Sequence, residues 1–344
     1  MEHSLSKTSR AEHAVVMRRG SRSEFSDLVE PYRRELHVHC YRMMGSLQDA
    51  EDLVQETLLR AWRKRSTFEG RGSVRAWLYQ IATHTCLNAL ANRSPRRLPE
   101  AVYPPSDPAA PLATPAPESA WLEPFPDDLL PTEETAPHTL YDRRETITLA
   151  FLAVLQALPP RQRAVLLLCD VLEWRAGEAA FILETTTSAV NSALHRARLT
   201  CARLYHRRSS DSIRSAVDDL ATRGLLERYV HAWEASDMEE FVTLLKQDAR
   251  LDMPPSPSWY SGREAIRAFA RRIVFGGPGR WKLTPIRANA TFGYGVYRQA
   301  GPGAAYLPFG VQVLMLEDKC IAAVTIFMTP ALFPFFGLPL RLEH

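Results

Sequence analysis

The stretch DAEDLVQETLLRAW, residues 49–62, decides how the first part of this chain folds. Apolar residues recur along it at the i, i+3, i+4 and i+8 spacing of one buried helix face: Ala50, Leu53, Val54, Leu58, Ala61 and Trp62. The positions away from that stripe are Asp49, Asp52, Gln55, Glu56 and Leu59. The pattern predicts an amphipathic helix with an acidic polar face, for which plain solvation is the simplest explanation.

The stretch that follows, residues 68–93, has a different chemistry. Its sequence FEGRGSVRAWLYQIATHTCLNALANR gives a Gly-rich loop and then a helix with basic, aromatic and amide side chains: Arg75, Trp77, Tyr79, Gln80, His84 and Asn88. Cations fix phosphates, whereas aromatic and amide groups stack on exposed bases or form hydrogen bonds with them. This combination favours contact with single-stranded or melted DNA over contact with an intact groove.

Residues 158–204 carry a second helical signal. Leu-Pro-Pro starts an apolar helix, and a short amphipathic helix (175–183), a Thr-rich turn and a longer helix (188–203) follow. The order is typical of a helix-turn-helix, whose last helix enters a major groove. The exposed positions predicted on that helix are Asn191, Ser192, His195, Arg196 and Arg198. A three-helix packing module that binds no DNA is the alternative.

The charges of the chain are unevenly distributed. Lys and Arg against Asp and Glu give +4 for residues 1–94, −6 for 95–140, +4 for 141–210 and +1 for 211–344. Residues 95–137 hold 12 prolines, which predicts an extended, partly disordered linker between two basic helical regions. The segment WLEPFPDDLL (121–130) is both apolar and acidic. It is interpreted as a docking segment, with a passive tether as the alternative.

Length and composition limit the class of protein. A chain of 344 residues is long enough for two or three domains with apolar cores. The five cysteines are scattered without zinc-like spacing, and no apolar run approaches 18 residues. We therefore expect a reduced, cytoplasmic protein with no cofactor, no metal site and no membrane contact.

The two helical regions together resemble regions two and four of bacterial extracytoplasmic-function (ECF) sigma factors. The motifs are DAEDLVQETLLRAW with RAWLYQIATHTCLNAL, and LPPRQRAVLLL with SAVNSALHRAR. The resemblance implies that the first region binds the clamp helices of the RNA polymerase β′ subunit and opens the minus-ten promoter element. It implies that the second region contacts the β flap and reads the minus-thirty-five element, while the acidic linker threads through polymerase.

The resemblance also assigns roles to individual residues. Polymerase contact falls on Asp49, Asp52, Gln55, Glu56 and Leu59. Minus-ten contact falls on Arg71, Ser73, Arg75, Trp77, Tyr79, Gln80, His84 and Asn88. Minus-thirty-five contact falls on Asn191, Ser192, His195, Arg196 and Arg198. Two positions depart from the pattern, because Glu184 stands where the turn often has Gly and Thr187 where an apolar residue is frequent.

The last part of the chain alternates differently. Two helices within 217–246 precede a strand (248–255), a helix (262–275) and four further strands, which predicts an α+β domain with a curved antiparallel sheet and a hairpin at 317–319. The order resembles SnoaL-like domains, the cone-shaped fold shared with nuclear transport factor two and ketosteroid isomerase. This resemblance implies a pocket, here with Asp252, Trp259, Tyr260, Phe292, Phe309 and Met328.

These predictions combine into one organisation and one function. We expect a tail (1–23), a region-two helical bundle (24–94), a linker (95–140), a region-four helix-turn-helix domain (141–208) and a SnoaL-like domain (209–344). The function predicted is that of a sigma factor, not an enzyme. The last domain is expected to regulate it through contact with the sigma domains and a small-molecule ligand.

Two other functions are left open. One is an isomerase or hydrolase tethered to a DNA-binding module, with Asp252 or His231 as general base. The other is a transcription repressor, which has no use for the acidic helix. The sequence leaves the promoter, the inducing signal, the ligand, the sign of regulation and the oligomeric state undetermined.

Overall fold

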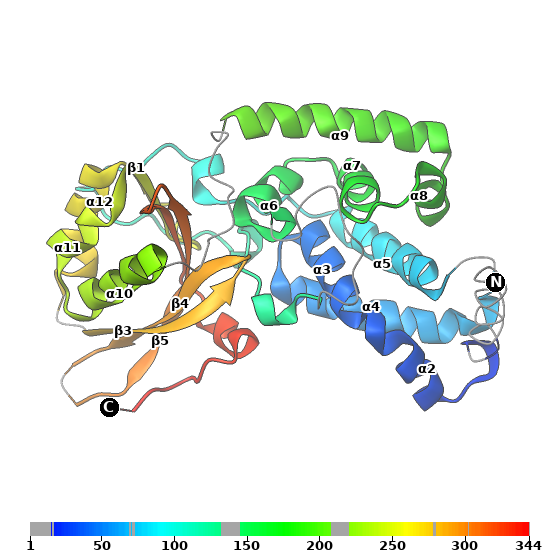
Figure 1. Cartoon of the computed structure of the whole chain (residues 1–344), viewed down its shortest axis with the longest axis horizontal. Coiled ribbons are helices and arrows are strands. Elements are labelled where there is room, and N and C mark those ends of the chain that lie inside the picture. Colours follow the sequence, from blue (N-terminus) through cyan, green and yellow to red (C-terminus); the bar gives the residue numbers. More distant parts are fainter. Residues whose placement is uncertain are drawn as a thin grey trace. The chain divides into compact units, whose positions relative to one another are not determined.

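The computed structural model describes residues 15, 17–68, 70, 73–131, 145–207, 220–277, 280–301 and 303–343 (Figure 1). The chain divides into two compact units. The first comprises Met1–Pro95, Leu129–Thr146 and Val154–Arg208, and the second comprises Arg96–Asp128, Ile147–Ala153 and Ser209–His344. Each unit is therefore assembled from segments that are far apart in the sequence.

The first unit is helical. Its helices are α2 (Arg22–Val29), α3 (Arg33–Met44), α4 (Leu47–Lys64), α5 (Val74–Leu90), α7 (Pro160–Leu166), α8 (Ala176–Ile182) and α9 (Thr187–Arg207). A π-helical turn, η8 (Leu167–Val171), follows α7, and helix α6 (Leu149–Gln156) has residues in both units. Ser21, Ser46 and Ser73 begin α2, α4 and α5 by accepting a backbone N–H of the first turn. Serine hydroxyls thus fix where these helices start.

A buried arginine joins the two halves of the first unit. Arg163 of α7 is 1% exposed, and its guanidinium donates to the Met43 carbonyl at the end of α3 and to Gln156 Oε1 at 2.6 Å. It also donates to the carbonyls of Gln156 and Leu158 at 3.2 Å. Burial lowers the pKa of Arg163 to about 10, so the group remains charged at neutral pH. These bonds replace the lost hydration and tie α7 to α3.

A buried histidine in the first unit makes its stability depend on pH. His39 of α3 is 1% exposed, and its Nε2 lies 3.0 Å from Thr83 Oγ1 of α5. Burial, followed by the charges of Arg42 and Arg75, lowers the pKa of His39 to about 3, against 6.5 in the unfolded chain. The folded state therefore binds fewer protons than the unfolded state between these values.

We accordingly expect the free energy of unfolding to fall by about 1.4 kcal/mol for each pH unit below about pH 6 through His39 alone. Urea denaturation at pH 7, 6 and 5 measures this slope. The His39→Gln variant keeps a hydrogen-bonding group but has no proton to gain. The pH dependence of its unfolding free energy should therefore be weaker by up to about 1.4 kcal/mol per pH unit, the equivalent of one proton. Equal slopes for the two proteins would contradict the prediction.

The second unit is built on a six-stranded sheet in the order β2-β1-β6-β5-β4-β3. The strands are β1 (Leu245–Asp252), β2 (Trp259–Ser261), β3 (Arg280–Ala288), β4 (Thr291–Gln299), β5 (Tyr306–Glu317) and β6 (Cys320–Phe327). The pairs are antiparallel as expected, except β1 with β6, which is parallel. Asp318 and Lys319 form the predicted β5–β6 hairpin with positive φ values of 50° and 61°.

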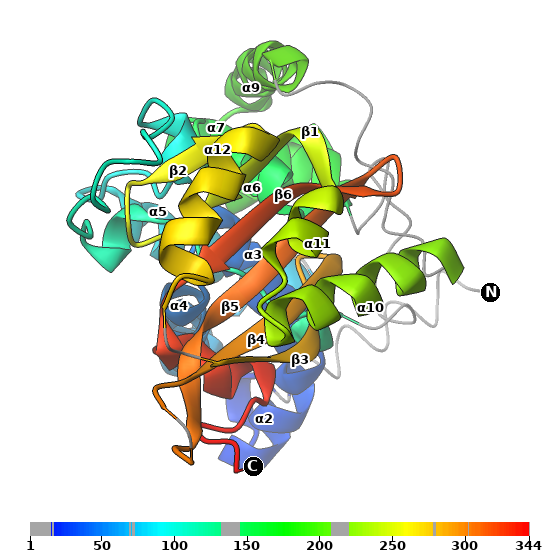
Figure 2. The same ribbon diagram turned by 90° about the vertical axis from the view of Figure 1, so that its left-hand side faces the viewer.

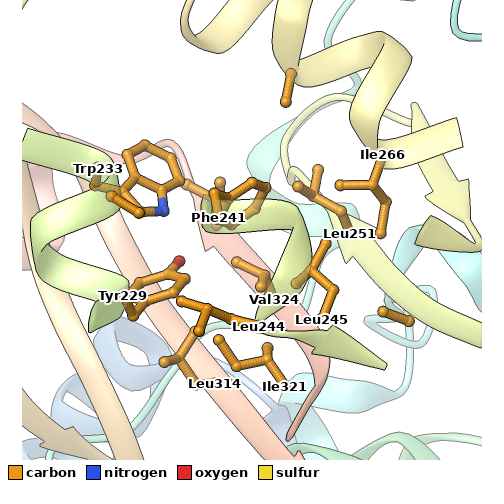
Figure 3. Close-up of a cluster of buried hydrophobic side chains, with 14 of the residues drawn as sticks. Tyr229, Trp233, Phe241, Leu244, Leu245, Leu251, Ile266, Leu314, Ile321 and Val324 are labelled. Atoms are coloured by element: carbon orange, nitrogen blue, oxygen red, sulfur yellow. The ribbon is translucent and has the colours of Figure 1, made fainter. Parts of the chain in front are cut away.

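Helices cover one face of this sheet. Figure 2 shows α10 (Leu220–Glu234), α11 (Met238–Thr243) and α12 (Arg263–Phe269) on the same side of the strands. Aromatic side chains fill the space between the two layers: Trp233 and Phe241 have ring centroids 5.9 Å apart, and Tyr229 stacks on Tyr294 at 5.6 Å. Figure 3 shows Tyr229 and Trp233 of α10 directed into this cluster. The core of the second unit therefore lies between helices and sheet.

Two further segments pack on this unit: the C-terminal segment, which contains the 3₁₀ helix η10 (Pro330–Phe336), and the linker. The C-terminal segment follows β6, and there Phe333 packs on Tyr297 at 5.0 Å while the Tyr297 hydroxyl donates to the Pro339 carbonyl at 2.9 Å. The linker residues Trp121, Leu122 and Phe125 are at most 4% exposed. The expected partly disordered tether is thus wrong for residues 96–128, which are packed into the second unit. Residues 132–140 of the predicted linker, and 141–144 of the predicted region-four domain, lie outside the described residues.

Candidate functional site

Helix α4 presents the predicted acidic face. Leu47, Ala50, Val54, Thr57 and Ala61 are buried along one side of the helix. The opposite side carries an exposed row at i, i+3, i+4 and i+7 spacing, formed by Asp52, Gln55, Glu56 and Leu59. Leu59 is 48% exposed, which is unusual for a leucine in a row of acidic and amide groups. The row offers a partner both negative charge and an apolar contact.

The acidic residues of α4 are not equally free. Glu56 pairs with Arg60 one turn later, with Oε1 and Nε 2.6 Å apart. Asp49 lies closer to the helix start and pairs with Arg93 at 2.8 Å. Because Asp49 holds the end of α5 in this way, its carboxylate has a structural partner in addition to the predicted one.

Helix α5 begins at Ser73, whose hydroxyl accepts from the backbone N–H of Ala76 at 3.1 Å. In its first turn, Arg75 pairs with Glu35 of α3 through both carboxylate oxygens, at 2.8 to 3.1 Å. The Tyr79 hydroxyl donates to the same carboxylate at 3.3 Å, and the Tyr79 side chain is fully buried. Tyr79 is therefore a core residue in this structure, and its minus-ten contact stays a prediction.

A tryptophan from the second helical region covers Arg75 and Tyr79. The Trp174 ring, between η8 and α8, lies 5.7 Å from the Tyr79 ring, and the Arg75 guanidinium carbon lies 5.2 Å from its centroid. The guanidinium thus has both an ion pair with Glu35 and a cation–π contact. In this arrangement Arg75 is directed at the protein interior and not at a free phosphate.

The next two predicted residues on α5 also contact the second helical region. Gln80 Nε2 donates to Glu184 Oε1 at 3.1 Å. His84 Nε2 donates to the Ile182 carbonyl at 3.1 Å and lies 3.9 Å from Glu184 Oε1. Among the other predicted positions, Trp77 packs on Phe68 at 5.4 Å, Asn88 is exposed and Arg71 lies outside the described residues.

The helix-turn-helix has the predicted form. Helix α8 ends in a turn where Glu184 has a positive φ of 50°, and the Thr186 hydroxyl then accepts from Ala189 N at the start of α9. The sequence departure at Glu184 is thus accommodated by a left-handed backbone on a residue other than glycine. Four predicted DNA-contacting residues on α9 are exposed: Asn191, Ser192, His195 and Arg196.

Arg198 differs from the other predicted residues of α9. Its guanidinium binds both carboxylate oxygens of Asp170, with Nη2–Oδ1 at 2.6 Å and Nε–Oδ2 at 2.9 Å. Asp170 lies in η8, and its side chain is 5% exposed. Because this bidentate pair fixes α9 to η8, Arg198 has a structural role within the domain.

The residues predicted to line one pocket in the second unit are brought together only in part: Tyr260, Phe309 and Met328 belong to one hydrophobic cluster, whereas Asp252 and Trp259 do not. Asp252 pairs with Trp259 across the β1–β2 register, and Leu251 pairs with Tyr260, so Trp259 and Tyr260 point to opposite faces of the sheet. The Trp259 indole donates to the linker carbonyl of Tyr103 at 2.9 Å. Tyr260 stacks on Phe269 at 4.3 Å, and Phe309 packs on Trp281 at 5.0 Å. Asp252 is 2% exposed.

The linker meets the second unit mainly through charges and backbone groups. Arg250 pairs with Glu100, and Arg272 donates to the Ala110 carbonyl. Arg287 lies 3.7 Å from Asp127. Arginines of the second unit thus hold an acidic segment in three places along its length.

Asn289 is the residue of this contact that sequence reasoning missed. It is fully buried with φ 53°, and its Oδ1 accepts from Phe125 N at 2.9 Å while its Nδ2 donates to the Ile147 carbonyl at 2.7 Å. The backbone N–H of Asn289 also donates to the Phe125 carbonyl at 2.9 Å. Its place in a strand-to-strand turn, where asparagine is ordinary, gave no sign of partners so distant in sequence.

Two negative findings apply to the described part of the chain. Within those ranges, no three His, Cys, Asp or Glu side chains gather closely enough to hold a metal ion. Among the described helices, none has the length and apolar character needed to cross a bilayer. The five cysteines, all of them described, are free.

Three family descriptions match successive parts of the chain. Residues 28–96 match Sigma-70 region 2, residues 148–201 match Sigma-70 region 4, and residues 226–322 match a SnoaL-like domain. These matches fall on the α2–α5 helices, the helix-turn-helix and the sheet unit, respectively. The predicted resemblance and the predicted fold class are confirmed.

Individual relatives agree with these matches. The chain is 46% identical over 321 residues to the ECF RNA polymerase sigma factor SigG of Mycobacterium tuberculosis. The aligned residues cover 92% of this chain and 85% of SigG. It is 27% identical over 324 residues to SigJ of the same organism. The crystal structure of M. tuberculosis SigJ superposes with a TM-score of 0.58 at 22% identity, over 93% of this chain and 100% of that one, and thus shares the fold.

Proposed function

Because the chain belongs to the ECF RNA polymerase sigma factors, we propose which of its surfaces meet the polymerase and which meet the promoter. It is a sigma factor that binds core RNA polymerase and directs promoter recognition and transcription initiation. Its two sigma regions stand in the order that this function requires, and a relative of 46% identity covers nearly the whole chain. That agreement carries the conclusion.

The polymerase-binding surface is the exposed row of α4. Asp52, Gln55, Glu56 and Leu59 combine acidic groups with a half-exposed leucine and lie on the side of α4 opposite its buried stripe. Such a row suits a basic helical partner, because carboxylates pair with cations while a central apolar contact excludes water. We assign it to the β′ clamp helices. Contact of the second helical region with the β flap rests on the family resemblance alone.

The promoter-binding surfaces are divided between α5 and α9. On α9, the exposed Asn191, Ser192, His195 and Arg196 lie within the first three turns, where a recognition helix meets base edges of the minus-thirty-five element. On α5, Gln80, His84 and Asn88 follow one another at four-residue spacing and form a single line of hydrogen-bonding groups. This line is assigned to the melted minus-ten element.

The sheet unit regulates initiation through the linker. Buried linker residues such as Trp121, Leu122 and Phe125, together with the ion pair Arg250–Glu100, support a linker held by the C-terminal domain in the free protein. Contact of this domain with the sigma regions, and a small-molecule ligand for it, stay predictions. We further propose that the domain is not catalytic, because Asp252 lies on the sheet face shared with Trp259 and not in the aromatic core.

The test is transcription in vitro from genomic DNA of the source organism, with core RNA polymerase and 5′-end sequencing of the transcripts. The full chain should direct initiation at sites that share a two-part upstream sequence, whereas core polymerase alone should not. Asp252→Asn should leave this initiation intact. Absence of initiation together with failure to bind core polymerase in a pull-down would support a repressor. Turnover lost in Asp252→Asn would support the tethered enzyme.

A further inference from the structure

The turn between α8 and α9 holds a glutamate where glycine would be less strained. Glu184 has φ 50°, in the left-handed region that costs free energy for any residue with a Cβ. The side chain is 67% exposed, so it is not kept there by packing. What distinguishes Glu184 is the set of polar groups that its carboxylate faces.

The carboxylate of Glu184 is directed at α5. Its Oε1 accepts from Gln80 Nε2 at 3.1 Å and lies 3.9 Å from His84 Nε2, which donates to the Ile182 carbonyl next to the turn. Gln80 and His84 are one helical turn apart on α5, so both face the same turn of the helix-turn-helix. One short segment, residues 182–184, thus occupies two neighbouring donors.

These donors are of the kind that DNA would use. An amide N–H and an imidazole N–H donate equally well to a carboxylate, a phosphate oxygen or a base acceptor. A carboxylate also carries the negative charge of the phosphate that it would replace. Because Glu184 and His84 are both partly exposed, the contact contributes little to stability and opens easily.

We propose that Glu184 is an autoinhibitory plug in the free protein. Its carboxylate occupies the Gln80 donor of α5 and lies beside His84, whose own donor is occupied by the Ile182 carbonyl, and the turn leaves both side chains when single-stranded DNA binds. The inference rests on the minus-ten role assigned to α5 above. The new element is that one residue in the turn of the helix-turn-helix masks α5. The mask is removed when sigma regions two and four separate.

A matched pair of variants tests the plug. Glu173 also has a positive φ, 55°, is exposed and lies on the approach to α8, and its side chain has no hydrogen bond or ion pair among the described contacts. Glu173→Gly therefore removes the same charge and relieves the same strain as Glu184→Gly, but uncovers nothing on α5. The probe is a fluorescein-labelled single-stranded DNA 20-mer of random sequence, whose binding to the full chain is followed by anisotropy.

Glu184→Gly should bind this DNA about three- to five-fold more tightly than the unmodified protein, and Glu173→Gly less than about two-fold more tightly. The gain of Glu184→Gly should disappear when Gln80→Ala and His84→Ala are added. An equal gain for the two glycine variants would show that only net charge matters and would overturn the plug. A gain that persists without Gln80 and His84 would overturn it as well.

A second measurement separates the plug from the function of α5. Modification of His84 by diethylpyrocarbonate, followed by mass spectrometry of the α5 peptide without DNA, reports whether the contact opens. It should become faster in Glu184→Gly and stay unchanged in Glu173→Gly. If neither His84 reactivity nor DNA affinity changes, the plug is wrong and the minus-ten role of α5 is untouched. If reactivity rises while DNA affinity does not, the minus-ten role itself fails.

Discussion

Reversing two charges on α4, as Asp52→Lys with Glu56→Lys, is expected to weaken binding to core RNA polymerase about 100-fold, at about 1.4 kcal/mol for each reversed charge. Both side chains lie on the exposed row, away from the buried residues Leu47, Ala50 and Val54. The new lysines would face the cations that the carboxylates are proposed to pair with. Binding is measured with labelled protein and core polymerase in a titration, and transcription should fall in parallel.

The fold should survive this change. Glu56 gives up its pair with Arg60 at 2.6 Å, but both side chains are 39% exposed, so the loss is about 0.5 kcal/mol. Circular dichroism and the urea midpoint should therefore stay close to those of the unmodified protein. An unfolded double variant would assign these carboxylates a structural role and contradict the proposed interface.

A control on α2 has the same charge change. Asp27 is exposed, and Glu30 pairs with an arginine on the same surface, Arg33, at 3.3 Å, much as Glu56 pairs with Arg60. Asp27→Lys with Glu30→Lys thus shifts the net charge equally without touching α4. Polymerase binding that weakens equally in both double variants would show a general effect of charge and remove the assignment to α4.

The features that sequence predicted best are those set by local pattern. The apolar stripe of α4 and the turn of the helix-turn-helix follow from spacing within about four residues. The exposed row of α4 and the four exposed residues of α9 were predicted for the same reason. Periodicity specifies which side of a helix is buried before its partner is known.

What sequence did not predict depends on partners far along the chain. Tyr79 looked available for base stacking because its helix alternates polar and apolar residues, whereas Glu35 and Trp174 from other elements bury it. Arg198 looked like a phosphate ligand until Asp170 took both of its donors. The parallel β1–β6 pair likewise depends on two strands about 75 residues apart, which periodicity within one strand does not relate. In each case the arginine, the aromatic side chain or the strand has a partner that lies far away in the sequence.

The packing of the linker also could not be predicted from local sequence, and this affects how regulation by the C-terminal domain is tested. Twelve prolines and six net negative charges are typical of a disordered tether, and composition alone gives no other prediction. In the structure, proline-rich backbone in extended form lies against the second unit, and its apolar residues are buried there. A chain cut near residue 210 would leave Trp121, Leu122 and Phe125 without the surface that covers them. Regulation by this domain is therefore better tested with point variants of the full chain.

Replacing Asn289 is expected to give the largest loss of stability in the second unit. Asn289→Ala leaves two buried backbone groups without their partner, the N–H of Phe125 and the carbonyl of Ile147. It also places alanine at φ 53°, which asparagine tolerates better. Two lost hydrogen bonds at about 1–1.5 kcal/mol each, with about 1 kcal/mol of backbone strain, predict a decrease of about 3–4 kcal/mol in the free energy of unfolding.

Comparison with Asn289→Gly separates the two contributions. Glycine adopts the left-handed backbone without strain, so Asn289→Gly should lose only the stability that the two hydrogen bonds provide. Its free energy of unfolding should be about 1 kcal/mol higher than that of Asn289→Ala. In both variants chymotrypsin should cut the full chain faster after Trp121 and Leu122, which are at most 4% exposed in the intact protein. Urea denaturation and timed proteolysis measure the two effects on the same samples.

The two measurements together decide whether Asn289 is the anchor of the linker. Faster cleavage with an unchanged unfolding free energy would mean that the linker detaches without weakening the sheet unit. A lower unfolding free energy with unchanged cleavage would mean that Asn289 supports the β3–β4 turn alone. The first result would contradict the predicted loss of stability, and the second would contradict the anchor. Because one side chain bonds to both Phe125 and Ile147, its loss should release the linker and the start of α6 in the same step.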